Sequence, residues 1–258
     1  MNRAAASPPL ERLAAPPIVE VACGVVFEPL RELDPVAAGL FWGRVRDEYP
    51  ERALLPAITN ETRTITIGAL PPMRTMLLSR SGEQLIQLQS DRFNYNWRAI
   101  GSVYPRFSSN EGVGAQAQAR FEQLCAFLDE TFGCHPEPSH VEVVKVDLLR
   151  SDEHWQGLPD LSQLLPPLAP LLSGRSLSAP NLSVQLQDEW AGCVTHVRVQ
   201  SHPLPDATAI RLETAAHAPV GAEGLAHAFA RANEAVNQAF AWLIPKSERE
   251  RRFQEERS

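Results

Sequence analysis

The feature that most constrains the fold is a pair of adjoining extended segments, residues 85–89 and 92–98, connected by a Ser-Asp turn. In the second segment an aromatic ring alternates with a polar residue without a break. Successive side chains of a strand point to opposite faces, so Phe93, Tyr95 and Trp97 are predicted to share one face, packed into the core. The opposite face carries two guanidinium groups and two carboxamides, and we expect it to meet solvent. These four polar residues are Arg92, Asn94, Asn96 and Arg98.

The surrounding pattern predicts further strands and two helices in the N-terminal half. Strands are predicted at 18–27, 73–80, 83–89 and 141–149, and helices at 35–49 and 111–132. Thr62–Ile67 alternates like a strand, but prolines interrupt the region around it. Apolar residues on both faces of 141–149 indicate a central strand. The order strand, helix, strands, helix, strand is that of a ferredoxin-like βαββαβ unit with added strands.

In the C-terminal half, too, predicted strands are followed by a predicted helix. Strands are predicted at 182–190, 193–201 and 208–216, and a helix at 222–243. The predicted class is α+β, with two halves of mainly antiparallel sheet packed against long helices. The chain is predicted to consist of five segments: a mobile Ala/Pro-rich arm (1–15), an N-terminal half (16–150), a Pro/Leu-rich connector (151–180), a C-terminal half (181–245) and a charged tail (246–258). The tail is interpreted as a solvated helical extension.

Composition narrows the classes of function. Hydrophobic and charged contents of 44% and 21% are typical of a folded globular chain of 258 residues. A net charge of −7 argues against sequence-independent binding to nucleic acid or to an anionic membrane. The sequence shows neither a secretory signal nor an apolar run of membrane-spanning length, and its four cysteines have no C-x-x-C spacing. We therefore expect a cytoplasmic protein with free thiols.

Motifs that carry chemistry are not found in the sequence. Cys134, His135 and His140 lie close together but match no zinc spacing. Gly112-Val113-Gly114 lacks the third glycine and the preceding strand of a dinucleotide-binding loop. There is no G-x-S-x-G segment. We therefore predict no catalytic residue, no metal and no cofactor, and favour a binding protein over an enzyme.

The polar face of the second segment is the candidate binding surface. Guanidinium and carboxamide groups on one strand face can bind carboxylates, phosphates or the backbone of a partner. Tyr104 and Arg106, just downstream, are predicted to extend the surface. The expected partner is another protein, and formation of a homo-oligomer is left open.

Several segments resemble a family of uncharacterised bacterial and archaeal proteins of similar length and sporadic distribution, known only by a model number. They are Pro16–Val21, Leu88–Phe93, Asn96–Arg98, Tyr104–Phe107, Val141–Leu149 and Asn233–Ile244. The family usually continues the strand at 141–149 after Val146 with an Arg-Tyr-x-Asn pattern, whereas this chain has Leu149-Arg150-Ser151-Asp152. The difference leaves open any role for that end of the strand. The resemblance implies no activity. Its patchy distribution is like that of defence, toxin-neutralising and mobile-element genes.

Two hypotheses of different class follow. The first is a non-enzymatic, regulatory protein-binding component of a bacterial defence or conflict system, such as an inhibitor or immunity protein, acting through residues 92–98. The second is an enzyme or small-ligand receptor with a pocket between the two halves. A buried cleft with convergent ionisable side chains would favour the second hypothesis.

Overall fold

One antiparallel sheet of nine strands forms the framework of the protein. The computed structural model describes residues 13–58, 73–172 and 183–254. The strands are β1 (Ile18–Phe27), β2 (Glu51–Pro56), β3 (Met73–Leu78), β4 (Gln84–Gln89), β5 (Arg92–Arg98), β6 (Pro138–Arg150), β7 (Ser183–Trp190), β8 (Cys193–Pro203) and β9 (Thr208–Pro219). Their order across the sheet is β2-β3-β4-β5-β1-β6-β9-β8-β7. The predicted α+β class with antiparallel pairing is confirmed.

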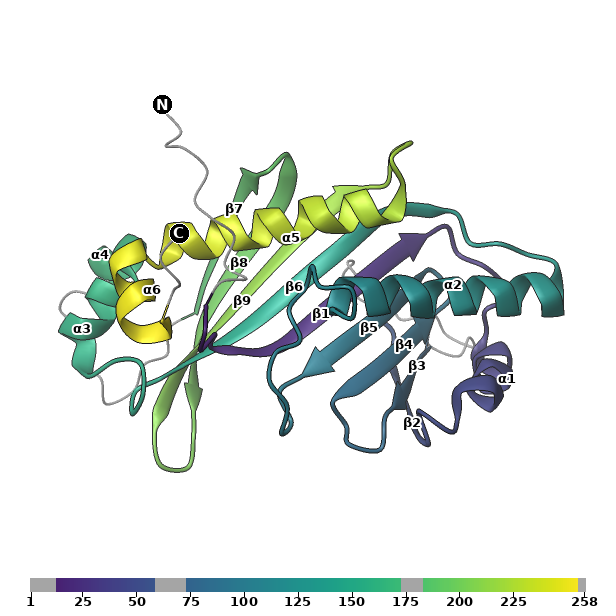
Figure 1. Ribbon diagram of the computed structural model, residues 1–258, viewed down its shortest axis with the longest axis horizontal. Coiled ribbons are helices and arrows are strands. Elements are labelled where there is room, and N and C mark those ends of the chain that lie inside the picture. The colour runs from purple at the N-terminus through teal and green to yellow at the C-terminus, as the bar shows by residue number, and fades with distance from the viewer. Residues whose placement is uncertain (1–12, 59–72, 173–182, 255–258) are drawn as a thin grey trace, which may run out of the picture.

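Six α-helices and one 3-10 turn accompany the sheet in the described part of the chain. They are α1 (Pro35–Val45), α2 (Val113–Phe132), α3 (Gly157–Leu164), η2 (Pro166–Leu168), α4 (Ala169–Leu172), α5 (Gly224–Leu243) and α6 (Lys246–Phe253). Figure 1 shows α2 and α5 lying across the same face of the sheet, with α3, α4 and α6 gathered at one end of the molecule and α1 at the other. The sheet thus has a helix-covered face and a second face that no described helix covers, here called the open face.

The two predicted halves share the sheet without a break. Central strand β6 pairs with β1 on one side and with β9 on the other. Edge strand β2 was not predicted, because the prolines around it obscured the strand pattern. Five predicted regions fall wholly or partly outside the described residues: 1–12 of the arm, Thr62–Ile67, 173–180 of the connector, 181–182 at the start of the C-terminal half and 255–258 of the tail.

Local sequence signals explain where several elements begin and end. Helix α1 begins after Asp34, whose carboxylate accepts hydrogen bonds from the amides of Val36 and Ala37, each at 2.8 Å. Helix α2 ends at Gly133, which takes a left-handed conformation with φ of 65°. The tail is helical as expected, because residues 246–253 form α6, but it is packed against the protein rather than solvated, since Arg249 and Phe253 are buried.

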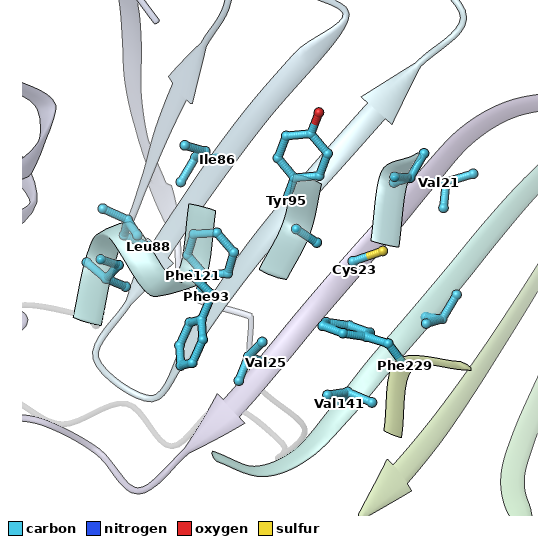
Figure 2. Close-up of a cluster of buried hydrophobic side chains, with 14 of the residues drawn as sticks. Val21, Cys23, Val25, Ile86, Leu88, Phe93, Tyr95, Phe121, Val141 and Phe229 are labelled. Carbon is cyan, nitrogen blue, oxygen red and sulfur yellow. The ribbon is translucent and has the colours of Figure 1, made fainter. Parts of the chain in front are cut away.

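The predicted aromatic face of β5 packs into the core beneath α2 (Figure 2). The Phe93 ring lies 5.7 Å from that of Phe121 on α2, measured between centroids. The Tyr95 hydroxyl donates to Gln116 Oε1 at 2.6 Å, which satisfies its polar end. The inward orientation of the three rings is confirmed, since Phe93, Tyr95 and Trp97 are all buried.

Candidate functional site

The polar face of β5 does not meet solvent as predicted. Arg92, Asn94 and Asn96 are 7%, 6% and 4% exposed, and Arg98 is half-buried. The expectation of an open surface is therefore wrong for three of the four residues. Strands β4 and β1 flank β5, and their side chains lie beside these polar groups on the same face.

Neighbouring strands supply hydrogen-bond partners to these side chains. Asn96 accepts from Gln87 Nε2 at 2.9 Å and donates to Glu20 Oε1 at 2.7 Å. The guanidinium of Arg98 donates to the carbonyl of Gly82 through Nε at 3.0 Å and Nη2 at 2.5 Å. Buried amides paired in this way stabilise the fold and leave few groups for a partner to contact.

A glycine on β1 lets the polar side chains lie flat on the open face. A Cβ atom added to Gly24 would come within 2.5 Å of Asn94 Oδ1. Arg92 lies beside two carboxylates, with Nε 3.9 Å from Asp91 Oδ1 and Nη1 4.0 Å from Glu142 Oε2. The charge of Arg92 is thus offset within the sheet.

The two downstream candidates lie in the loop between β5 and α2. Tyr104 is 8% exposed, and its ring centroid lies 5.4 Å from that of Trp97. Arg106 is half-buried with a positive φ of 68°, and its carbonyl accepts from the amide of Val113 at 3.0 Å. Tyr104 turns inward and leads to a small cavity on the helix-covered face.

This cavity lies between β6, α5 and the loop that carries Tyr104. Its volume is about 20 Å³, enough for a single water molecule. Three elements far apart in sequence contribute its polar walls. The lining residues are Leu13, Ile18, Tyr104, Lys145, Asp147, Val236, Asn237 and Phe240.

A lysine ammonium is buried at the cavity. Lys145 is 4% exposed, and its Nζ donates to Asn237 Oδ1 at 2.8 Å. The same Nζ lies 6.0 Å and 5.8 Å from the ring centroids of Tyr104 and Phe107. The hydrogen bond and the two aromatic faces offset part of the cost of removing this charge from water.

Asp147 lies on the same face of β6 as Lys145, because the two are separated by one residue. It is 2% exposed. Burial raises the pKa of Asp147 to about 7, against the lowering effect of Lys145. Its carboxyl group lines the same cavity as Lys145. A buried carboxyl group that titrates near neutral pH can bind and release a proton under ordinary conditions.

Two more polar groups near Lys145 have no partner among the described residues. Asn237 is 3% exposed, and its Nδ2 donates no hydrogen bond there. Thr214 is fully buried directly opposite Lys145 in the β6–β9 pairing, and its Oγ1 also has no partner in that part of the chain. Unsatisfied groups of this kind are few in native proteins. Together with Asp147 they mark this region as the candidate site.

The sequence interpretation missed these residues, although part of the signal was present. Val141, Val143 and Leu149 fall on one face of the predicted central strand, and positions 145 and 147 share that face by period two. Two charged residues on a buried strand face are unusual enough to indicate a site. The approach of Asn237 from α5 leaves no such trace in the sequence.

Two other features of the described residues are weaker candidates. A hollow of about 440 Å³ near the start of α1 is lined mainly by apolar residues, and its Asp34 carboxylate already caps α1. On the open face the ring centroids of His140 and His196 lie 6.0 Å and 5.8 Å from that of His217, and burial lowers the pKa of His217 and His140. In the described ranges no three His, Cys, Asp or Glu side chains are placed to hold a metal ion.

Comparison with protein-family models, with curated proteins and with solved structures found no match to this chain. Among the described helices, none has both the length and the apolar character needed to cross a membrane.

Proposed function

We propose that the protein is a small-ligand receptor whose cavity at Lys145, Asp147 and Asn237 takes the polar head of a neutral ligand. The observation that carries the proposal is the Asn237 Nδ2 donor, which has no partner among the described residues and belongs to a lining residue of the cavity, together with the buried Asp147 carboxyl. A ligand that satisfies both recovers free energy that the unliganded fold lacks.

The donor and acceptor pattern indicates the chemical class of the ligand. Asn237 Nδ2 requires an acceptor, and ionised Asp147 requires a donor. The charges of Lys145 and ionised Asp147 offset each other, so an ionic head group would add an uncompensated buried charge. A carboxamide or hydroxyl group supplies both a donor and an acceptor without a charge.

Thermal unfolding in the presence of acetamide, glycerol and acetate tests the proposal. We expect acetamide or glycerol, but not acetate, to stabilise the wild type by about 1.4 kcal/mol at ten times the Kd. The control is the double variant Asn237→Leu/Lys145→Met, which keeps the side-chain volumes but lacks the polar head site. Equal stabilisation of both proteins, or stabilisation of neither, would argue against a receptor.

Partner binding within a defence or conflict system stays a prediction from the sequence. Of its six candidate residues, Arg98 and Arg106 are the ones with half-buried rather than buried side chains. A pull-down that compares wild type with Arg98→Ala/Arg106→Ala tests this hypothesis. Identical recovery of a bound protein by both would remove these residues from the interface.

We also infer that residues 16–150 form a ferredoxin-like unit within a two-part molecule. The spatial order β6-β1-β5-β4, with β2 and β3 added outside β4, supports the ferredoxin-like interpretation. The C-terminal part contributes β7, β8, β9 and α5. Hydrogen exchange tests the division, because two units would open with separate protection free energies.

A further inference from the structure

One wall of the cavity belongs to neither a helix nor a long strand. Leu13 lines the cavity and is 2% exposed, although it lies in the segment that precedes β1. The segment ends where the Pro17 carbonyl accepts from the Leu148 amide at 2.9 Å. Residues 13–17, here called the strap, therefore place an apolar side chain against Lys145 and Asp147.

The strap is attached to the C-terminal end of α6. The amides of Ala14 and Ala15 donate to the carbonyls of Gln254 and Phe253 at 3.3 Å and 3.2 Å. Both distances are at the long end of the range for such bonds. The position of the strap therefore depends on the docking of α6.

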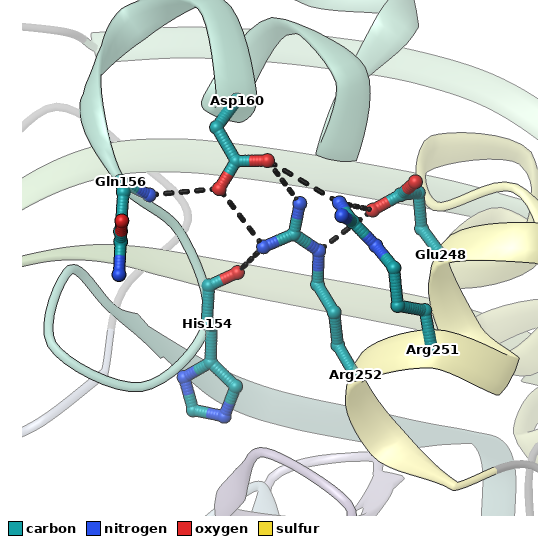
Figure 3. A network of polar contacts seen from close by, with 6 residues as sticks. All are labelled: His154, Gln156, Asp160, Glu248, Arg251 and Arg252. Carbon is teal, nitrogen blue, oxygen red and sulfur yellow. Dashed lines mark hydrogen bonds and ion pairs between the residues drawn. The ribbon is translucent and has the colours of Figure 1, made fainter.

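Ion pairs hold α6 against α3 (Figure 3). Arg252 contacts the carboxylate of Asp160 through both terminal nitrogens, and its Nε donates to Glu248 Oε2 at 2.6 Å. It also donates to the carbonyl of His154. The Arg252 side chain is 9% exposed, whereas that of Arg251, which contacts the same two carboxylates, is 54% exposed. Arg252 is the better shielded of the two and should contribute more to docking.

An aromatic contact connects α6 to the cavity wall. Phe253 is fully buried, and its ring centroid lies 6.4 Å from that of Phe240, a lining residue of the cavity. Undocking of α6 would thus remove both the hydrogen bonds that hold the strap and the packing behind Phe240.

We propose that the strap is a lid that controls access to the Lys145–Asp147 cavity, and that docking of α6 through Arg252 holds it closed. This inference rests on the proposed function, because a cavity with room for one water molecule admits a larger ligand only when Leu13 moves away. The lid and the receptor are nevertheless tested by different measurements.

The chain offers a built-in reference for the test, because Lys145 and Lys246 are its two lysines. Lys246 has a side chain that is 58% exposed, whereas Lys145 is buried. Cyanate carbamylates amines, and mass spectrometry of peptides measures the ratio of modification at Lys145 to that at Lys246. The probe is cyanate itself, so no ligand is required.

We expect Leu13→Ala and Arg252→Gln each to raise this ratio about tenfold over wild type, since local opening sets the rate of modification. Arg251→Gln is the matched control and should leave the ratio unchanged. Thermal unfolding of each variant confirms that it is folded under the labelling conditions.

Each outcome bears on a separate part of the inference. An unchanged ratio in Leu13→Ala would overturn the lid. A rise in Leu13→Ala without a rise in Arg252→Gln, or an equal rise in Arg251→Gln, would overturn control by Arg252. If the ratios rise as expected while acetamide and glycerol fail to stabilise the wild type, the lid stands and the proposed function fails.

Discussion

Two groups of buried polar side chains lie on opposite faces of the same sheet, and they differ in how well their hydrogen bonds are satisfied. On the open face, Asn96 bonds to Gln87 and Glu20 on the flanking strands. On the helix-covered face, the Nδ2 of Asn237 and the Oγ1 of Thr214 have no partner among the described residues. Arg92 Nε on the open face also lacks a hydrogen-bond partner among the described residues, but it lies near the carboxylates of Asp91 and Glu142. The amide of Asn96 is paired through both of its polar atoms, whereas that of Asn237 leaves its donor unused.

This difference indicates two roles for buried polar side chains. Paired side chains stabilise the fold, whereas unpaired ones serve another purpose. The hydrogen bonds of a paired buried amide offset the free energy of its desolvation, whereas an unpaired buried amide destabilises the fold. Replacing a buried charged group and its partner by apolar residues is often neutral or stabilising. The cavity therefore contains groups that folding alone does not require.

The largest expected effect is that of Asn237→Leu. This change keeps the volume but removes Asn237 Oδ1, which accepts a hydrogen bond from the buried Lys145 ammonium. We expect the free energy of unfolding to fall by about 3 kcal/mol. Urea denaturation measures the loss.

Adding Lys145→Met to Asn237→Leu removes the buried charge as well. The double variant should recover to within about 1 kcal/mol of wild type. If the double variant is as unstable as the single one, then these groups support the fold, and the contrast between the two clusters fails.

The second expected effect is a pH dependence due to Asp147. Because burial raises its pKa from 3.8 to about 7, the native state binds a proton more tightly than the unfolded state between these values. Its stabilising contribution is full below about pH 4 and is lost as the pH rises through 7. Wild type should lose up to about 1.4 kcal/mol of stability per pH unit over this range relative to Asp147→Asn.

Urea titrations at several pH values between 5 and 8 measure this difference. Effects of other titrating groups, such as His217 and His140, cancel in the comparison of the two proteins. Parallel profiles for wild type and Asp147→Asn would show that Asp147 has an ordinary pKa.

A third effect concerns the open face. Asn96→Ala should lower the free energy of unfolding by about 1–3 kcal/mol, because Gln87 and Glu20 both lose a buried partner. Gln187→Ala is the control, since Gln187 is exposed and lies in the same cross-strand row on edge strand β7. It should change stability by less than about 0.5 kcal/mol. Equal effects would mean that the pairing around Asn96 contributes nothing.

The contrast also shows which parts of the structure were predictable from the sequence. The alternation in residues 92–98 was sufficient to predict that the rings of β5 face inward, because period two is an intrinsic property of a strand. It was insufficient to predict the exposure of the polar face. That exposure depends on Gln87, Glu20 and the close approach allowed by Gly24, which belong to other strands.

The cavity was predictable only in part for a related reason. Lys145 and Asp147 share a strand face by spacing alone, and the apolar residues around them indicated that the face is buried. The contact between Lys145 and Asn237 joins residues 92 positions apart. Nothing local specifies a contact of this separation, because it depends on how α5 crosses β6.

The smallest expected effect compares two fully buried threonines on adjacent strands. Thr195 on β8 donates to the carbonyl of Cys193 at 3.2 Å, whereas Thr214 on β9 has no partner for its hydroxyl among the described residues. Replacement by valine keeps the shape and removes only the hydroxyl. Thr195→Val should therefore cost about 1 kcal/mol, and Thr214→Val should be neutral or stabilising by up to about 1 kcal/mol. Differential scanning calorimetry measures the stability of the two variants. Equal losses of stability would mean that the Thr214 hydroxyl is hydrogen-bonded as well as the Thr195 hydroxyl.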